Sequence, residues 1–84
     1  MVYKIVLPKK VQKDLQKIDN KYRQRIRLAL IGLSNDPFLG KKLDGKRKDQ
    51  LSLVVWPYRI IYEIFKKELV VLVIRIGHRQ GVYK

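Results

Sequence analysis

The chain has 84 residues, of which 46% are hydrophobic, and its 20 Lys and Arg against 7 Asp and Glu give a formal net charge of +13. This length predicts a single domain, residues 1–84, and the hydrophobic fraction excludes a disordered basic tail. With no cysteine and one histidine, disulfides, thiolate chemistry and histidine-cluster metal sites are excluded, so we expect no metal and no other cofactor.

The first part of the chain has the pattern of one strand followed by two helices. Residues 2–7 are rich in β-branched and aromatic types and stop at a proline, which is typical of a strand. Apolar residues then recur at helical spacing over residues 11–18. A second helical period starts after Asn20, a candidate N-cap, and stops at residues 34–37. The two helices are predicted to form an antiparallel hairpin.

Residues 36–50 contain a proline, two glycines and five cations, which predicts a loop with a basic tip. We expect three apolar side chains, those of Phe38, Leu39 and Leu43, to hold this loop against the core. A run of cations is most often a solvated loop, but these five are also candidate RNA-binding residues. They are Lys41, Lys42, Lys46, Arg47 and Lys48.

Three strands are predicted after the loop, over residues 51–56, 58–65 and 69–76. In the second of them, Tyr58 and every other residue after it share one face, and Arg59 lies on the opposite face. The third is apolar on both faces, as a central strand would be. The order strand, helix, helix and three strands predicts an α+β fold. It consists of an N-terminal strand and an antiparallel helical hairpin that packs on one face of a small antiparallel sheet.

Polar residues gather where the last strand ends. If the last two strands pair as an antiparallel hairpin, Arg59 lies at the same end of the sheet as the residues that follow the last strand. The four residues expected to converge there are Arg59, His78, Arg79 and Tyr83. Guanidinium groups bind phosphate oxygens, an imidazole transfers protons near neutral pH, and a phenol offers a stacking face for a base. The combination indicates a site for a phosphodiester.

Three of these residues also have an ordinary structural explanation. Arg59 would equally form a salt bridge with Glu63 or Asp49, His78 would be a solvated residue at a strand end, and Tyr83 would anchor the end of the chain in the core. The expected convergence of the residues, rather than any one of them, therefore carries the interpretation.

The segments YRIIYEI (residues 58–64) and VVLVIRIGHRQGVY (residues 70–83) closely resemble the RelE/ParE superfamily of toxins from bacterial and archaeal type II toxin–antitoxin operons. The resemblance extends over nearly the whole chain and implies a RelE-like β-α-α-β-β-β fold. RelE-type members are endoribonucleases that cut mRNA in the ribosomal A site. ParE-type members share the fold and poison DNA gyrase.

The resemblance implies a metal-free mechanism, in which the 2′-hydroxyl of the RNA attacks the adjacent phosphate. An arginine matching Arg59 steadies the pentacoordinate phosphorane. An arginine matching Arg79 protonates the leaving 5′-oxygen or holds the phosphate, and a tyrosine matching Tyr83 orients or stacks the nucleotide. These roles agree with electrostatic stabilisation of transition-state charge and with in-line positioning.

The chain departs from the RelE pattern on the strand before the YR pair. RelE enzymes carry basic residues there, whereas the matching positions are Ser52 and Val54. His78 would replace the missing proton carrier, or Lys46 or Lys48 would reach in from the loop. Without such a replacement, the chain would bind RNA and cut it poorly, or follow the gyrase-directed branch.

We therefore predict a ribosome-dependent mRNA endoribonuclease, with a ParE-like gyrase inhibitor as the alternative and a plain basic RNA-binding domain as the third interpretation. The expected partners are a cognate antitoxin, the ribosome and mRNA, with operator DNA reached only through the antitoxin complex. A charge of +13 suits an acidic antitoxin segment or nucleic acid, although a lysine-rich surface alone would also produce it. The apolar runs are too short to span a bilayer, so we expect a cytoplasmic protein with no membrane partner.

Overall fold

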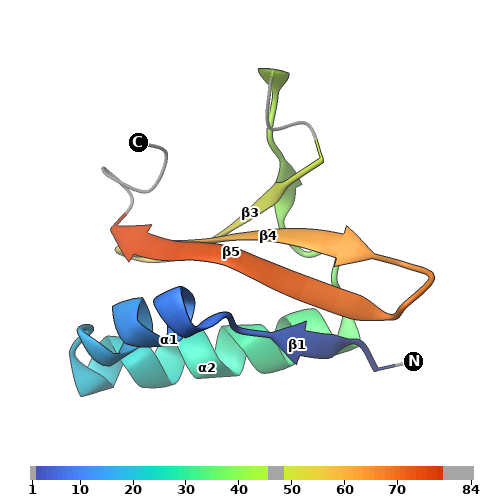
Figure 1. The fold of residues 1–84 in the computed structure, drawn as a ribbon. Helices are drawn as coiled ribbons and strands as arrows, with labels where there is room; N and C mark the ends of the chain where they lie inside the picture. The colour runs from blue at the N-terminus through green and yellow to red at the C-terminus, as the bar shows by residue number, and fades with distance from the viewer. Residues whose placement is uncertain (1, 46–48, 79–84) are drawn as a thin grey trace.

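Two helices pack on one side of a five-stranded sheet in the computed structural model, which describes residues 2–45 and 49–78 (Figure 1). The elements in chain order are β1 (Lys4–Val6), α1 (Lys9–Gln16), α2 (Asn20–Asn35), β2 (Lys41–Lys42), β3 (Leu51–Val55), β4 (Tyr58–Phe65) and β5 (Val70–His78). The strands lie side by side in the order β1-β5-β4-β3-β2. This arrangement confirms the predicted α+β class and the packing of both helices on one face.

The sheet is mixed rather than wholly antiparallel. Strands β2 to β5 pair antiparallel, but β1 runs parallel to β5. Two hydrogen bonds fix the residue before β1 beside the end of α2: the Tyr3 N–H donates to the Ser34 carbonyl at 2.8 Å, and the Ser34 side-chain hydroxyl donates to the Tyr3 carbonyl at 2.7 Å. The predicted loop over residues 36–50 also contains β2, which extends the sheet beyond β3.

Both helices are amphipathic and turn their apolar stripes toward the sheet, as the 3.6-residue period predicts. The N-cap of α2 is Asp19, and the predicted cap residue, Asn20, is the first residue of the helix. No helix within residues 2–45 and 49–78 is both long and apolar enough to cross a membrane.

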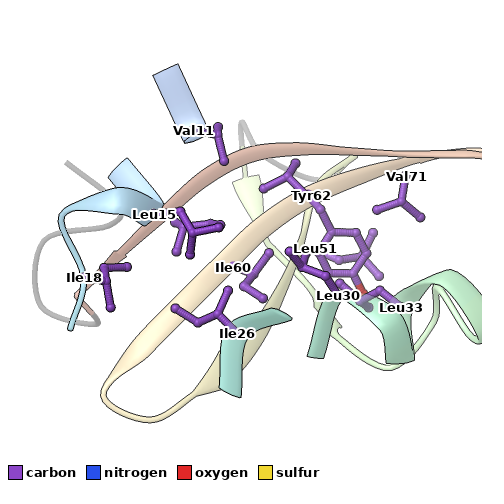
Figure 2. Close-up of a cluster of buried hydrophobic side chains, with 12 residues drawn as sticks. Val11, Leu15, Ile18, Ile26, Leu30, Leu33, Leu51, Ile60, Tyr62 and Val71 are labelled. Atoms are coloured by element: carbon purple, nitrogen blue, oxygen red, sulfur yellow. The ribbon is translucent and has the colours of Figure 1, made fainter. Parts of the chain in front are cut away.

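A single apolar cluster fills the space between the helices and the sheet, and Figure 2 shows side chains from both layers meeting there. Its buried members are Val11, Leu15, Ile18, Ile26, Leu30, Leu33, Leu51, Ile60, Tyr62, Val71, Val73 and Ile76. Full burial of a side chain such as Ile26 contributes about 1.5–3 kcal/mol. Since Ile60 and Tyr62 of β4 lie in this cluster, the strand's alternation directs Arg59 to the face away from the helices.

Tyr62 holds the segment between α2 and β3 against the sheet. Its buried hydroxyl donates to the Pro37 carbonyl at 2.8 Å and accepts the Gly40 N–H at 2.9 Å. A Cβ on Gly40 would lie 2.6 Å from that hydroxyl oxygen and 2.8 Å from the carbonyl oxygen of Ser52. The position therefore requires glycine because the backbone approaches the sheet too closely for any side chain.

The predicted apolar anchors of this segment are wrong in two of three cases. Phe38 and Leu39 are 53% and 52% exposed, and only Leu43 is partly buried. The physical reason is that a polar anchor, the Tyr62 hydroxyl, already fixes the backbone and leaves these two side chains outside the core.

Candidate functional site

The face of the sheet opposite the helices carries the first part of the candidate site. In the β3–β4 hairpin, Val54 pairs with Arg59 and Ser52 pairs with Ile61. Because side chains alternate along each strand, Ser52, Val54 and Arg59 share one face. We call this face, which points away from α1 and α2, the open face.

A groove of about 390 Å³ lies on the open face. Its lining residues come from the β2 region, β3 and β4, and they are Leu39, Lys41, Lys42, Leu43, Ser52, Leu53, Val54 and Arg59. The β2–β3 pairing sets Lys41 opposite Ser52, which brings the cations of β2 to the strand that faces Arg59. We call the groove lined by these residues the Arg59 groove.

The Arg59 groove is electropositive. Three of its lining side chains are cationic, and none of those that the described ranges contribute is a carboxylate. Arg59 is partly buried, and its Nη1 donates to the buried Ser52 hydroxyl oxygen at 3.3 Å. This bond orients the guanidinium within the sheet face.

A groove of this composition suits a phosphate group. The guanidinium is planar, remains charged and presents several donors that match phosphate oxygens. Lys41 and Lys42 are exposed and add mobile positive charge at the rim. The partial burial of Arg59 strengthens its attraction to an anion relative to a fully solvated side chain.

His78 reaches the predicted end of the sheet but lies on the other face. The β4–β5 register pairs Arg59 with Gly77 and Tyr58 with His78, so the expected meeting of Arg59 with the end of the last strand is correct. The ring centroids of Tyr58 and His78 are 5.9 Å apart, and Tyr58 packs against the helix-side core. The structure therefore places His78 and Arg59 on different faces, because their positions in the register differ by one residue. A catalytic role for His78 stays a prediction.

Five predicted site residues lie outside the described residues. They are Lys46, Arg47, Lys48, Arg79 and Tyr83. Their participation stays a prediction. Within residues 2–45 and 49–78, no group of three or more His, Cys, Asp and Glu side chains is arranged to hold a metal ion.

Sequence reasoning treated Ser52 only as a missing basic residue and overlooked its contact with Arg59. The signal was available in the hairpin pattern: a very short connection between the two strands fixes the register, and parity then assigns Ser52 to the Arg59 face. The position of Lys41 beside Ser52 had no such signal, because a two-residue strand of lysines has no apolar alternation.

Comparison with known proteins gives both a family and a fold. The chain matches the family model described as the ParE toxin of the type II toxin–antitoxin system parDE over residues 5–83. A search of the curated proteins finds no match.

Solved structures match across almost the whole chain. The RelBE2 toxin–antitoxin complex from Mycobacterium tuberculosis gives a TM-score of 0.85 at 25% identity, covering 94% of this chain and 100% of that one. The archaeal RelE–RelB complex from Pyrococcus horikoshii gives 0.81 at 25% identity, covering 96% and 99%. A mutant of Escherichia coli toxin RelE in the free state gives 0.81 at 23% identity, covering 96% and 87%, and supports the fold alone.

Proposed function

The chain belongs to the ParE toxin family of type II toxin–antitoxin systems, and we propose that this toxin acts by cutting mRNA on the ribosome. The observation that carries the proposal is the Arg59 groove, where a partly buried guanidinium is oriented by Ser52 beside Lys41 and Lys42. The similarity in fold to RelE structures supports the same conclusion.

In the proposed reaction, the 2′-oxygen of one nucleotide forms a bond to its own 3′-phosphorus while the bond from phosphorus to the 5′-oxygen of the next nucleotide breaks. The 2′-hydroxyl loses a proton and the leaving 5′-oxygen gains one. The products are a 2′,3′-cyclic phosphate and a free 5′-hydroxyl. Arg59 stabilises the extra negative charge on the phosphorane, a type of contribution worth about 10²–10³ in rate.

The other proposed roles follow the family pattern. Arg79 would hold the phosphate or protonate the leaving oxygen, and Tyr83 would orient the nucleotide. We assign no role to His78 in this proposed step, since its ring lies beside Tyr58 on the helix-side face.

An antitoxin is the proposed protein partner. The solved neighbours include toxins in complex with RelB, and a net charge of +13 complements an acidic segment. Operator DNA would be bound through that complex, and the free toxin would meet mRNA and the ribosome in the cytoplasm.

Gyrase inhibition is the second candidate, and a specific observation favours it. The matching family model is that of ParE toxins, and β3 presents Ser52 and Val54 to the Arg59 groove where RelE-type nucleases have basic residues. A gyrase inhibitor would use the fold without cutting RNA.

The test compares the wild-type chain with Arg59→Ala, and with Lys67→Ala as a control that removes one positive charge from the remote β4–β5 turn. Primer extension on a translated mRNA should show cuts in the A site with wild type and Lys67→Ala, and none with Arg59→Ala. Arg79→Ala and Tyr83→Ala should likewise relieve growth arrest. Equal growth arrest by all variants without cuts, together with inhibited gyrase supercoiling, would replace the nuclease proposal with the second candidate.

A further inference from the structure

Three aromatic rings form a continuous row on the helix-side face, at the end of the sheet where β5 stops. Tyr22 of α2 lies 5.8 Å from Tyr58 of β4, and Tyr58 lies 5.9 Å from His78 of β5, between ring centroids. The Tyr58 and His78 rings meet edge to face, with an interplanar angle of 76°. We call this row the aromatic row. None of its members belongs to the Arg59 groove.

A pocket of about 370 Å³ opens beside the outer end of the aromatic row. It lies between α1 and β5, and its lining residues are Asp14, Lys17, Ile18, Tyr58, Arg75, Ile76, Gly77 and His78. His78 is exposed and Tyr58 is partly buried. The pocket therefore combines the exposed end of an aromatic row with the cation of Lys17, the C-cap residue of α1.

Positive charge also surrounds the inner end of the row. Lys21 Nζ lies 5.0 Å from the centroid of the Tyr22 ring, and Arg25 Cζ lies 5.7 Å from it. Stacking faces bordered by Lys and Arg are the recurring means by which proteins hold unpaired nucleotides, since bases stack on the rings and phosphates meet the cations.

Asp14 decides between nucleotides and acidic peptides as the occupant. A carboxylate repels an acidic side chain and a phosphate alike, so its charge alone favours neither occupant. The same carboxylate accepts a hydrogen bond from the exocyclic amino group of a base. The pocket is thus better suited to a nucleobase with its phosphate than to an acidic segment of a protein.

We propose that this pocket is a second RNA-binding site, which takes one unpaired nucleotide with its base stacked on His78 beside Tyr58 and its phosphate near Lys17. Tyr58 and His78 lie on the face opposite the Arg59 groove. The nucleotide held here is therefore a different one from the nucleotide whose phosphate binds Arg59. It needs no cleavage chemistry and stands whether or not the open face cuts RNA.

The chain's single histidine makes the test direct, because its ring protons give the only histidine signals in the NMR spectrum. The probe is a short single-stranded 2′-O-methyl RNA, which the chain cannot cleave because the attacking hydroxyl is blocked. On saturation, the His78 ring protons should shift upfield from the ring current of the stacked base. An abasic strand of the same length and charge should bind more weakly and leave these signals in place.

Two substitutions of His78 separate stacking from charge or protonation. His78→Ala should weaken binding of the oligonucleotide about 5- to 150-fold, the range found for loss of one stacked base. His78→Tyr should restore it, because a phenol stacks as an imidazole does but takes up no positive charge near neutral pH. Fluorescence anisotropy of a labelled strand gives these affinities, and Lys67→Ala provides the exposed control.

Repeating the titration with Arg59→Ala distinguishes this site from the proposed nuclease site. The shift of the His78 signals should persist in that variant. The inference is overturned if the His78 signals stay in place at saturation, if the abasic strand shifts them equally, or if His78→Ala binds like wild type. Loss of the shift with Arg59→Ala would also overturn it, since the two sites would then be one.

Discussion

At the scale of single residues, a shift of one position along β4 decides which face of the sheet, and so which of the two sites, a side chain lines. Tyr58 points into the aromatic row and Arg59 into the Arg59 groove, because consecutive residues of a strand face opposite sides. The same parity separates Gly77 from His78 on β5. Sequence reasoning identified the correct end of the sheet but grouped residues from both faces, since the register within the β4–β5 hairpin includes a bulge between Ile61 and Tyr62.

Tyr62→Phe tests the polar anchor beneath the open face. The substitution removes the hydroxyl bonded to the Pro37 carbonyl and the Gly40 N–H, and we expect the free energy of unfolding to fall by about 1–3 kcal/mol, the cost of leaving buried polar groups without that bond. Denaturant unfolding measures the change. An unaltered free energy would show that water or neighbouring groups replace the hydroxyl.

The pH dependence of stability provides a separate signature of Tyr62. Burial, with a further contribution from the Asp36 carboxylate, raises the pKa of the Tyr62 phenol above its ordinary value of 10.0, although the Gly40 N–H lowers it. Its contribution is therefore fully present below about pH 10 and is lost as the pH rises through the raised pKa. Unfolding measured from pH 8 to 11 should show less alkaline loss in Tyr62→Phe than in wild type.

Two glycine substitutions should have opposite effects. At Gly40 a methyl group would collide with the Tyr62 hydroxyl and the Ser52 carbonyl, so Gly40→Ala should destabilise the chain by about 1–3 kcal/mol. At Gly32, inside α2, the nearest atom to a new Cβ is 3.6 Å away, and alanine should stabilise the helix by about 0.5–1 kcal/mol. Thermal unfolding of both variants checks the contrast, and equal shifts in Tm would contradict it.

At the scale of elements, the strongly patterned segments were predicted and the weakly patterned ones were not. The helices and β4 carry clear apolar periods, and β5, predicted as a central strand, lies between β1 and β4. The parallel direction of β1 could not be predicted, since its sequence is compatible with either direction and the choice depends on where α2 ends. Strand β2 is held by pairing with β3 rather than by any preference of lysine for strands.

Ser34→Ala tests how β1 is attached. The substitution removes the hydroxyl that donates to the Tyr3 carbonyl, and we expect a loss of about 0.5–1.5 kcal/mol. Hydrogen exchange should become faster for the amides of β1 while those of β4 change little. Gln24→Ala, at an exposed position on the same helix, is the control, and equal exchange in both variants would contradict a local role for Ser34.

At the scale of the whole molecule, cations lie on both faces, and each face carries a proposed RNA-binding site. The open face combines Arg59 with the lysines of β2, and the helix-side face has the aromatic row with its surrounding cations. The net charge was readable from the sequence, but its division between two faces required the fold, because neighbouring residues such as Tyr58 and Arg59 serve different sites.

Lys41→Ala should weaken RNA binding in a way that depends on salt. Losing one phosphate contact to a single strand should reduce the slope of log affinity against log salt concentration by about 0.7. Anisotropy titrations of the 2′-O-methyl strand at several salt concentrations measure this slope. Lys67→Ala removes the same charge from the remote turn, so an equal reduction there would show that only net charge matters.

The most direct measurement of the central claim is the chemistry of the RNA ends made by the purified chain on ribosomes translating a defined mRNA. Attack by the 2′-hydroxyl should leave a 2′,3′-cyclic phosphate on the upstream fragment and a 5′-hydroxyl on the downstream one. We also predict that a 2′-deoxy substitution at the cleaved nucleotide blocks cutting and that Arg59→Ala slows it by about 10²–10³. Intact mRNA in the presence of wild-type chain that inhibits gyrase supercoiling would contradict the account.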